Sequence, residues 1–534
     1  MDLPIDAVLD DLVTASRDAR GFVLVAPPGA GKTTRVPRML ADGEVRGQIL
    51  VVQPRRVAAR SAAARLAVED GSPLGERMGY AVRFDRRATA ATRVVVMTEG
   101  VLLRRLQADP FLSDVGAVLL DEFHERSLAS DLALGLLAEV RRDARPDLIV
   151  GVMSATLDPA AVAAFLGGVP TVRSEGRTFP LTVTHRACDV GPATHPRDLA
   201  RDVADAIVEA SWAAEGDVLA FLPTIRAVRE TVDLVRARRA DLDVLPLHGA
   251  LSPAEQDRAL APASSRRVVV ATNLAETSVT VPGVRIVVDT GLARQPRFSS
   301  STGLDRLETV RISKASADQR AGRAGRTAPG RVVRLWPARS HDARPAFEPP
   351  EVHRVDLAGA VLQLLAWGTA PEAFAWFDPP PGPMLSAAQA LLADLGATEG
   401  GGLSSRGRAM ADLPLHPRLA RLVLAGDLDA RWAAAWLADS GRSDLPADLE
   451  LAVEAIASAP PRPVRRAFEQ LVRIAPPAPR ARRLPDAVLA AWPDRVAQVR
   501  PHAPDRARLV GGRGVRFAPD ALPPPYVVAI DVDD

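Results

Sequence analysis

The stretch "FVLVAPPGAGKTT", residues 22–34, decides the fold class of this 534-residue chain. Its four leading apolar residues predict a short buried strand, and the glycine-bearing segment after them predicts a loop. The loop closes at Lys32 and Thr33 in the spacing G-x-x-x-x-G-K-[ST], except that Ala26 replaces the first glycine. A strand that enters a helix through such a loop is typical of parallel α/β domains that bind phosphate groups.

The residue types of this loop suit a nucleoside triphosphate. Two glycines allow backbone N–H groups to curl around phosphate oxygens at the start of a helix. Lys32 is one of only two lysines among 67 basic residues, and its compact ammonium reaches phosphates that a forked guanidinium fits poorly. The hydroxyl of Thr33 suits Mg²⁺. A glycine-rich turn with a solvated lysine is the alternative. The predicted nucleotide-binding residues of the loop are Gly29, Ala30, Gly31, Lys32, Thr33 and Thr34.

A pair of adjacent carboxylates follows a second apolar run, in "VLLDEFHERS". Asp121 and Glu122 come directly after the predicted strand, where one carboxylate can hold Mg²⁺ and the other can polarise an attacking water. We therefore expect Asp121 and Glu122 at the metal, with Glu122 also acting on the water. The alternative is a capping acid at a helix start, and His124 by itself has an equally good structural interpretation.

The stretch "SADQRAGRAGR", residues 316–326, places polar groups at a spacing of three to four. On one helix Gln319, Arg323 and Arg326 share a face. Two guanidiniums there could stabilise charge on a γ-phosphate, and the amide could orient a water. A solvated basic helix is the alternative, although small residues between the arginines favour close approach.

Ten short β-branched runs alternate with helical patterns over the first 340 residues or so. Five lie before residue 155 and five between residues 217 and 336, which indicates two parallel-sheet α/β domains in tandem. In such sheets ligands bind at the carboxyl ends of the strands. From about residue 348 helical patterns replace the strands, and the last residues read as short strands that stop abruptly.

The bulk composition excludes several classes of protein. No apolar run approaches the ~18–20 residues of a membrane span, and the start "MDLPIDAVLDDL" lacks the basic and apolar parts of an export signal. Cys188 is the only cysteine, so no internal disulfide forms. We expect a cytoplasmic protein without a membrane partner. The net charge of only +2 does not by itself indicate a nucleic-acid partner. A basic surface that binds nucleic acid would therefore be confined to one part of the protein.

Taken together, the ordered motifs resemble those of the DEAH-box helicases of superfamily 2, and "DEFHERS" resembles the bacterial HrpB-type branch. Phe123 stands where the wider family usually has alanine. The resemblance covers about residues 15–480. Its motifs are "GAGKTT" (29–34), "DEFH" (121–124), "SAT" (154–156), "ATNLAETSVTVPGV" (271–284) and "QRAGRAGR" (319–326).

The resemblance implies a division into five domains. Two tandem RecA-like domains would be followed by a winged helix, a ratchet-like helical bundle and the start of a truncated OB-like fold. The implied ranges are 1–180, 181–345, 346–396, 397–480 and 481–534.

The resemblance also implies roles outside the nucleotide site. Arg55 and Arg56, then Thr98, Glu99 and Gly100, and in the second domain Thr272 and Asn273, the only asparagine, would border a nucleic-acid strand. The segment Ser154, Ala155 and Thr156 would couple hydrolysis to movement. The stretch between Asn273 and Gln319 resembles a β-hairpin that wedges duplexes apart.

One departure from the family concerns the nucleotide base. Arg65 aligns with the arginine that would cover one face of the base, but Leu260 stands where its aromatic counterpart would be. Losing that ring removes stacking of about 1–3 kcal/mol by analogy with base–aromatic contacts. We therefore predict weak discrimination among bases, with other nucleoside triphosphates accepted beside ATP.

The leading hypothesis is an ATP- and Mg²⁺-dependent hydrolase that translocates on nucleic acid. The resemblance implies single-stranded RNA, 3′-to-5′ movement and unwinding; we expect a monomer. Two alternatives stay open: an ATP-driven remodeller of RNA–protein complexes without processive unwinding, and a non-catalytic nucleic-acid-binding protein. Physiological substrate and adaptor proteins do not follow from the sequence.

Overall fold

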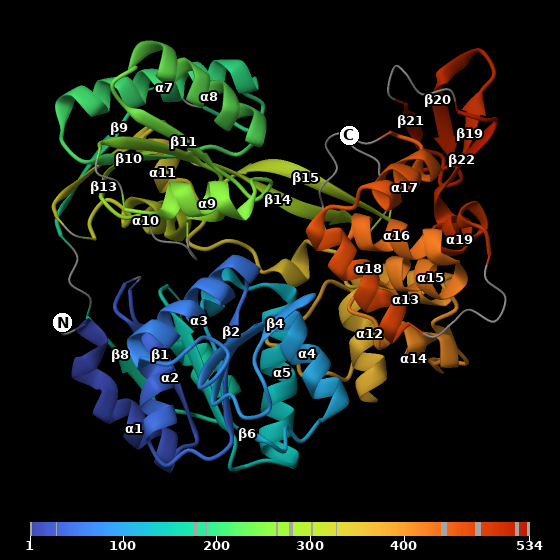
Figure 1. Ribbon diagram of the computed structural model, residues 1–534, viewed down its shortest axis with the longest axis horizontal. Coiled ribbons are helices and arrows are strands. Elements are labelled where there is room, and N and C mark those ends of the chain that lie inside the picture. The colour runs from blue at the N-terminus through green and yellow to red at the C-terminus, as the bar shows by residue number, and fades with distance from the viewer. Residues whose placement is uncertain are drawn as a thin grey trace.

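The computed structural model describes residues 3–530 except 28, 157, 176–178, 188–189, 263–264, 277–280, 301–302, 327, 439–445, 476–481 and 518–522. Cys188 and the tip of the predicted hairpin thus lie outside the described residues. Two α/β domains face each other, and a helical region lies to one side of both (Figure 1). Within the described residues no helix is long and apolar enough to cross a membrane.

The first domain is an eight-stranded sheet in the order β4-β3-β5-β2-β6-β7-β1-β8, parallel except for β4 against β3. Alternate residues of β1 point to opposite faces: Val23 joins one core cluster, and Phe22 and Leu24 join the other. The strands are β1 (Gly21–Val25), β2 (Gln48–Gln53), β3 (Met78–Val82), β4 (Asp85–Arg87), β5 (Val94–Thr98), β6 (Val115–Leu120), β7 (Ile149–Ser154) and β8 (Thr171–Arg173).

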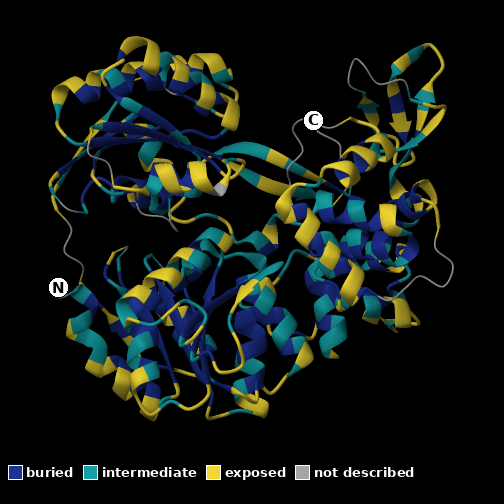
Figure 2. Cartoon of the chain, viewed as in Figure 1, coloured by how far each residue is buried: buried dark blue, intermediate teal, exposed yellow. Residues whose placement is uncertain are grey.

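Helices cover both faces of this sheet (Figure 1). Their inner faces are buried and their outer faces exposed, as Figure 2 shows. They are α1 (Leu9–Asp18), α2 (Lys32–Asp42), α3 (Arg56–Asp70), α4 (Glu99–Ala108), α5 (Leu128–Asp143) and α6 (Pro159–Phe165).

The second domain is a six-stranded parallel sheet in the order β11-β12-β10-β13-β16-β9. Its strands are β9 (Leu181–His185), β10 (Asp217–Phe221), β11 (Asp243–Leu247), β12 (Arg267–Ala271), β13 (Val284–Asp289) and β16 (Gly330–Arg334). Its helices are α7 (Pro196–Ala213), α8 (Ile225–Arg238), α9 (Pro253–Leu260), α10 (Lys314–Ala321) and α11 (Ala338–Asp342). The predicted pair of parallel-sheet domains is confirmed, since every one of the ten predicted runs forms a strand in one of the two sheets.

A two-stranded antiparallel hairpin leaves the second domain after β13. It consists of β14 (Leu292–Ser299) and β15 (Leu304–Arg311), paired from Leu292↔Arg311 to Ser299↔Leu304. It reaches across to the helical region (Figure 1). There Phe298 N donates to Arg354 O at 2.7 Å, and Arg495 Nη2 donates to Gly303 O at 3.2 Å. The hairpin therefore connects the second domain to the C-terminal third of the chain.

The C-terminal third contains one large hydrophobic core, which is formed by helices. A small sheet beside it has a separate core of its own. The predicted boundary at residue 396 falls between α13 and the two-strand turn β17–β18, which packs against α12, α13 and α14. The helices are α12 (Ala358–Trp367), α13 (Gly382–Asp394), α14 (Ser405–Ala411), α15 (Pro417–Ala425), α16 (Leu428–Leu437), α17 (Leu449–Ser458), α18 (Arg462–Ile474) and α19 (Leu484–Ala491). The strands are β17 (Thr398–Glu399), β18 (Gly402–Leu403), β19 (Val496–Arg500), β20 (Ala503–Leu509), β21 (Gly514–Arg516) and β22 (Tyr526–Val528), the last four forming an antiparallel sheet in the order β21-β20-β19-β22.

Candidate active site

The glycine-bearing loop lies at the carboxyl end of β1, between β7 and the start of α2. Ala26 is fully buried, and its N–H donates to Ser154 O at 3.0 Å. Gly29 and Gly31 have φ of +87° and +97°, the left-handed region that favours glycine. At Gly31 a Cβ would also lie 2.7 Å from a side-chain atom of Leu3. The loop therefore turns sharply and delivers the first residue of α2 to the sheet edge.

That first residue, Lys32, is only 4% exposed and faces the two carboxylates. Its Nζ lies 2.8 Å from Glu122 Oε1 and 3.8 Å from Asp121 Oδ1. Thr33 Oγ1 donates to Asp121 Oδ2 at 2.6 Å, and Gln53 Nε2 donates to the same oxygen at 2.7 Å. Three strands thus deliver one compact polar cluster at the edge where parallel α/β sheets bind ligands.

Charges within this cluster set the protonation of its members. Burial opposes the charge of Lys32, but Glu122 and Asp121 outweigh it and raise the pKa of the ammonium. Burial also opposes ionisation of Glu122, yet Lys32 and His124 hold the pKa of this carboxyl below its usual range. Burial raises the pKa of Asp121, with Lys32 opposing. Glu122 is therefore ionised at neutral pH, with Lys32 as the main cation that stabilises its charge.

The cluster has the donor set that Mg²⁺ takes when phosphates complete its shell. Thr33 and Asp121 offer a hydroxyl and a carboxylate oxygen 2.6 Å apart, and hard oxygen ligands suit Mg²⁺. Across the described part of the chain, no group of three or more His, Cys, Asp or Glu could hold a metal ion by itself. Thr33 and Asp121 would supply one or two protein oxygens, as is usual for Mg²⁺ that is also held by substrate phosphates.

The segment from Glu122 to Arg126 holds an unusual backbone conformation. Glu122 (φ +53°) and Arg126 (φ +46°) are both left-handed although neither is glycine, and they flank the 3₁₀ turn η2 (Phe123–Glu125). Each such residue costs about 1–2 kcal/mol, so surrounding contacts must hold it. Strain of this kind concentrates at functional sites.

His124 connects this segment to β7. Its Nδ1 accepts from Ala155 N at 3.4 Å, and its Nε2 lies 3.6 Å from Glu122 Oε2. Burial lowers the pKa of the imidazole, with Glu122 opposing. Ser154 is fully buried at the end of the strand. The motifs 121–124 and 154–156 are therefore in direct contact.

The opposite side of the site comes from the second domain, at and after α10. Gln319 Nε2 donates to Thr156 Oγ1 at 3.1 Å, across the seam between the domains. Arg323 is 3% exposed and donates to Glu276 O. Burial and the neighbouring Arg326 lower the pKa of Arg323 well below its usual value, while Glu122 opposes. Gln319 thus contacts Thr156 of the first domain, and Glu122 of the same domain acts on the pKa of both Arg323 and Arg326.

Two residues that hold the site, Glu276 and Gln53, were not predicted from the sequence. Glu276 accepts from Ser316 Oγ at 2.6 Å and from Arg320 Nε at 2.8 Å, and Arg320 also reaches Asp289 Oδ1 at 2.8 Å. Arg320 is 1% exposed, so it fixes the helix rather than facing a ligand. Gln53, which holds Asp121, was also missed. A polar residue ending a fully apolar strand was the signal available for it.

The predicted nucleic-acid residues lie on both domains. Arg55, just before α3, donates to Asn273 O at 3.2 Å and to Glu125 Oε2 at 3.2 Å, so it bridges the domains. Arg56 and Asn273 are exposed. Thr272 precedes the 3₁₀ turn η3 (Asn273–Ala275).

The second group of these residues begins α4. Thr98 ends β5, and Glu99 and Gly100 form the first turn of the helix, with Gly100 exposed. Burial, reinforced by Glu125 and opposed by a hydrogen bond with Ser127, raises the pKa of Glu99 to about 8. Glu99 is therefore largely neutral near pH 7.

The two predicted base-covering residues lie in different settings. The Arg65 side chain is 68% exposed on α3, and its Nε donates to Glu69 Oε1 at 2.8 Å, one turn away. Leu260 ends α9 and packs against the core of the second domain. Neither contributes a ring on which a base could stack.

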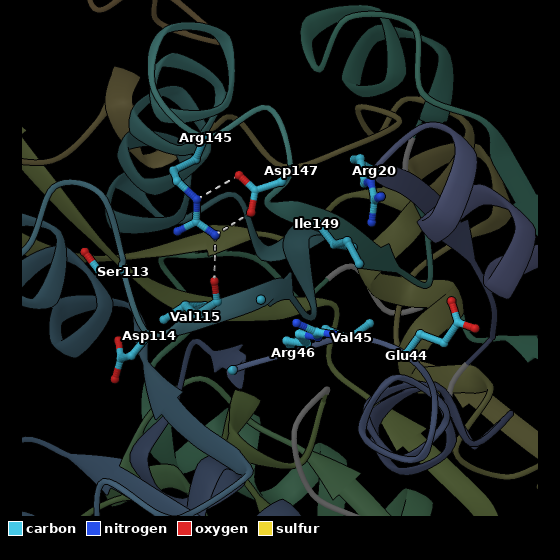
Figure 3. Close-up of a pocket in the computed structure, with 12 residues that line it drawn as sticks. Arg20, Glu44, Val45, Arg46, Ser113, Asp114, Val115, Arg145, Asp147 and Ile149 are labelled. Atoms are coloured by element: carbon cyan, nitrogen blue, oxygen red, sulfur yellow. Dashed lines mark hydrogen bonds and ion pairs between the residues drawn. The ribbon is translucent and has the colours of Figure 1, made fainter.

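A separate cavity of about 320 Å³ lies at the other edge of the first sheet (Figure 3). It is formed where β2, β6 and β7 begin, opposite the carboxyl ends that carry the site. Its lining mixes charges of both signs, and Arg145 is paired with Asp147 at 2.7 Å and donates to Val115 O at 3.1 Å. The cavity therefore takes no part in the seam.

Comparison with known proteins extends over most of the chain. Residues 7–165 match the family described as DEAD/DEAH box helicase, and residues 201–328 match the helicase conserved C-terminal domain. The chain is 44% identical over 438 residues to the ATP-dependent RNA helicase HrpB of Escherichia coli, covering 81% of this chain and 54% of that protein. It is 36% identical to the human probable ATP-dependent RNA helicase DHX34, covering 80% of this chain and 38% of that protein.

Among solved structures, the Escherichia coli DEAH/RHA helicase HrpB superposes with a TM-score of 0.90 at 38% identity. The match covers 99% of this chain and 68% of that one. The chain spans about half of the curated HrpB sequence and about a third of DHX34.

Proposed function

Because this chain belongs to the DEAD/DEAH-box helicase family, and within it to the HrpB-type DEAH-box helicases, we propose that it hydrolyses nucleoside triphosphates at the seam of its two RecA-like domains. The observation that carries the proposal is the hydrogen bond from Gln319 to Thr156, which joins the second domain to the sheet edge holding Lys32 and Asp121. Each side of the seam then supplies part of one reaction centre.

On the first domain, Lys32 is the residue we assign to the β- and γ-phosphates. Its Nζ lies 2.8 Å from Glu122, so a phosphate within its reach replaces one anionic partner by another. Glu122 is then released to accept a proton from the attacking water. Thr33 and Asp121 would hold Mg²⁺, which when bound neutralises charge on the phosphate oxygens.

On the second domain, we assign Gln319 to orienting the water, and Arg323 and Arg326 to stabilising charge that develops on the γ-phosphate. Burial favours these roles, because charge–charge interactions are stronger where water is excluded. Nucleotide binding therefore favours a closed seam, and product release permits opening. His124 contacts Glu122, and Thr156 in the segment 154–156 contacts Gln319. Through these contacts, we propose, closure of the seam is coupled to hydrolysis.

We propose single-stranded RNA as the partner, since the relatives are named RNA helicases. Arg56 and Asn273 are both exposed, one on each domain, and we assign them to contacts with a phosphate backbone. Arg55 links the same two segments, so opening the seam shifts one contact relative to the other. Contacts of this kind give little sequence specificity and a strong dependence on salt.

A second candidate keeps the hydrolysis but replaces strand separation by remodelling of RNA–protein complexes. One observation favours this second candidate. The hairpin β14–β15 is hydrogen-bonded by Arg495 and Arg354 of the C-terminal third, so it also has a structural role besides that of a wedge. Deleting residues 298–305 distinguishes the two. Loss of unwinding with hydrolysis retained supports a wedge, whereas unchanged strand separation supports remodelling.

The experiment that tests the proposed function is a hydrolysis assay with RNA, with single-stranded DNA and without nucleic acid, each at two salt concentrations. We expect stimulation by RNA that weakens at high salt. A Glu122→Gln variant is the matched control and should lose turnover. Turnover of this variant at the parent rate would instead favour the non-catalytic alternative.

A further inference from the structure

We infer that Phe377 and Asp378, which lie between α12 and α13, position Glu122 for catalysis by holding the far end of its loop. The inference rests on the proposed hydrolysis and adds positioning residues that lie outside the five motifs quoted from the sequence. The two residues come from the C-terminal third, about 250 positions away from Glu122 in the chain. They would make turnover depend on how that third sits against the first domain.

The segment from Glu122 to Arg126 is held at both ends. At one end Glu122 pairs with Lys32 at 2.8 Å. Both terminal residues adopt left-handed backbone conformations, with a single 3₁₀ turn between them. Because the turn is only three residues long and both flanking residues are constrained, a displacement of Arg126 also displaces Glu122. The position of Arg126 therefore helps to set the position of Glu122.

Arg126 is fixed jointly by the first domain and by the C-terminal third. Its Nε and Nη2 donate to the two carboxylate oxygens of Asp131 at 2.8 and 2.9 Å, and Nη2 also donates to Asp378. Its guanidinium lies 4.6 Å from the ring centroid of Phe377. A bidentate pair and a stacked ring restrict both the direction and the plane of the guanidinium.

Phe123 provides a second connection from the same loop. Its ring is 1% exposed and meets Phe377 edge-on, with centroids 6.1 Å apart at 62°. Phe377 also meets Phe165 edge-on at 5.3 Å and 79°. Edge-to-face pairs of this kind have a preferred geometry, so they define where the loop lies. The phenylalanine in "DEFH" thus has a specific partner in the C-terminal third.

Backbone contacts seat the same region on the first domain. Glu351 N donates to Arg126 O at 3.0 Å, and Leu128 N donates to Glu351 Oε2 at 3.1 Å. Gly135 of α5 admits Phe374, since a Cβ there would lie 2.4 Å from the Phe374 ring. The C-terminal third is therefore packed against the first domain next to the segment 122–126, and Phe377 and Asp378 contact that segment from a fixed position.

The test compares hydrolysis by wild type, Phe377→Ala, Asp378→Ala and the conservative Asp378→Glu. Trp367→Phe is the matched control: Trp367 Nε1 donates to Glu139 Oε1 at 3.0 Å in the same interface but away from residues 122–126. We expect kcat to fall about 10- to 100-fold in the two alanine variants with the KM for nucleotide changed by less than about threefold. Asp378→Glu should recover most of the loss, and Trp367→Phe should match wild type.

The outcomes separate the inference from the proposed function. If wild type is active and Phe377→Ala and Asp378→Ala have the same kcat as wild type, the inference is overturned and the proposed function is unaffected. A fall in kcat with a comparable rise in KM that Asp378→Glu does not reverse also overturns the inference, because it indicates a general structural effect. An equal fall in kcat in Trp367→Phe overturns it for the same reason. Wild type without turnover overturns both.

Discussion

The side-chain amide of Gln319 donates a hydrogen bond to the hydroxyl of Thr156 at 3.1 Å, although the two residues lie 163 positions apart. Thr156 lies two residues after the end of β7 in the first domain, and Gln319 lies on α10 of the second. This contact closes the seam next to Lys32, Asp121 and Glu122. It gives the two domains a direct connection at the proposed reaction centre.

The first prediction concerns this contact. Gln319→Ala and Thr156→Val should each lower kcat, because each removes the hydrogen bond that aligns the two sides. Since both variants delete the same bond, the double variant should lose less than the product of the single losses. We expect a coupling energy of about 1 kcal/mol from a double-mutant cycle on kcat/KM. Strictly multiplicative losses would show that the residues act independently.

The second prediction returns to the lysine in the glycine-bearing loop. Lys32→Arg should lower kcat about 10²- to 10³-fold, because the larger, planar guanidinium does not fit the enclosed position of Lys32, which is only 4% exposed. Lys314→Arg, the same change at the only other lysine, is the control and should behave as wild type. Steady-state hydrolysis measures both. Full activity of Lys32→Arg would mean that the ammonium has no special role.

The strands and the phosphate loop could be predicted because their signals are local. β1 and Lys32 lie within one short stretch, and Asp121 and Glu122 immediately follow an apolar run. β9 was missed because three of its five residues are exposed at the sheet edge, so it lacks the apolar pattern of a buried strand.

Contacts between distant segments could not be predicted in this way. Glu276 was not singled out, because its partners Ser316 and Arg320 lie 40 and 44 positions further along. The pairing of Phe123 with Phe377 likewise has no periodicity that would reveal it. Sequence patterns report which face of an element is buried, but they do not report which element covers that face.

The third prediction concerns pH and Glu99. Its pKa is raised from 4.5 to about 8, mainly by burial. Between these values the unfolded chain has lost the proton and the folded chain still holds it, so this group makes stability fall as pH rises. Glu99→Gln should remove that fall. Relative to wild type, the variant should gain about 1–2 kcal/mol in free energy of unfolding between pH 5 and pH 9, after allowance for solvent screening.

Denaturant unfolding at several pH values measures this difference. Glu44→Gln, at an exposed glutamate, is the control and should show no comparable gain. A Glu99→Gln curve parallel to that of wild type would contradict the raised pKa.

The fourth prediction concerns the nucleotide base. Arg65 is exposed and Leu260 is partly buried against the second domain's core, and neither is an aromatic residue on which a base could stack. We expect kcat/KM for ATP, GTP, CTP and UTP to agree within about tenfold, since the missing stacking is worth about 1–3 kcal/mol. Parallel hydrolysis assays with the four nucleotides measure this. Strict dependence on ATP would require recognition of adenine by other residues.

The most direct test of the composite site is a crystal structure with Mg²⁺ and a non-hydrolysable triphosphate analogue. We predict that the terminal phosphate lies between Lys32 on one side and the guanidiniums of Arg323 and Arg326 on the other, within about 3.2 Å of each. A bound analogue with both guanidiniums facing solvent or packed elsewhere would contradict the claim that the two domains share one reaction centre.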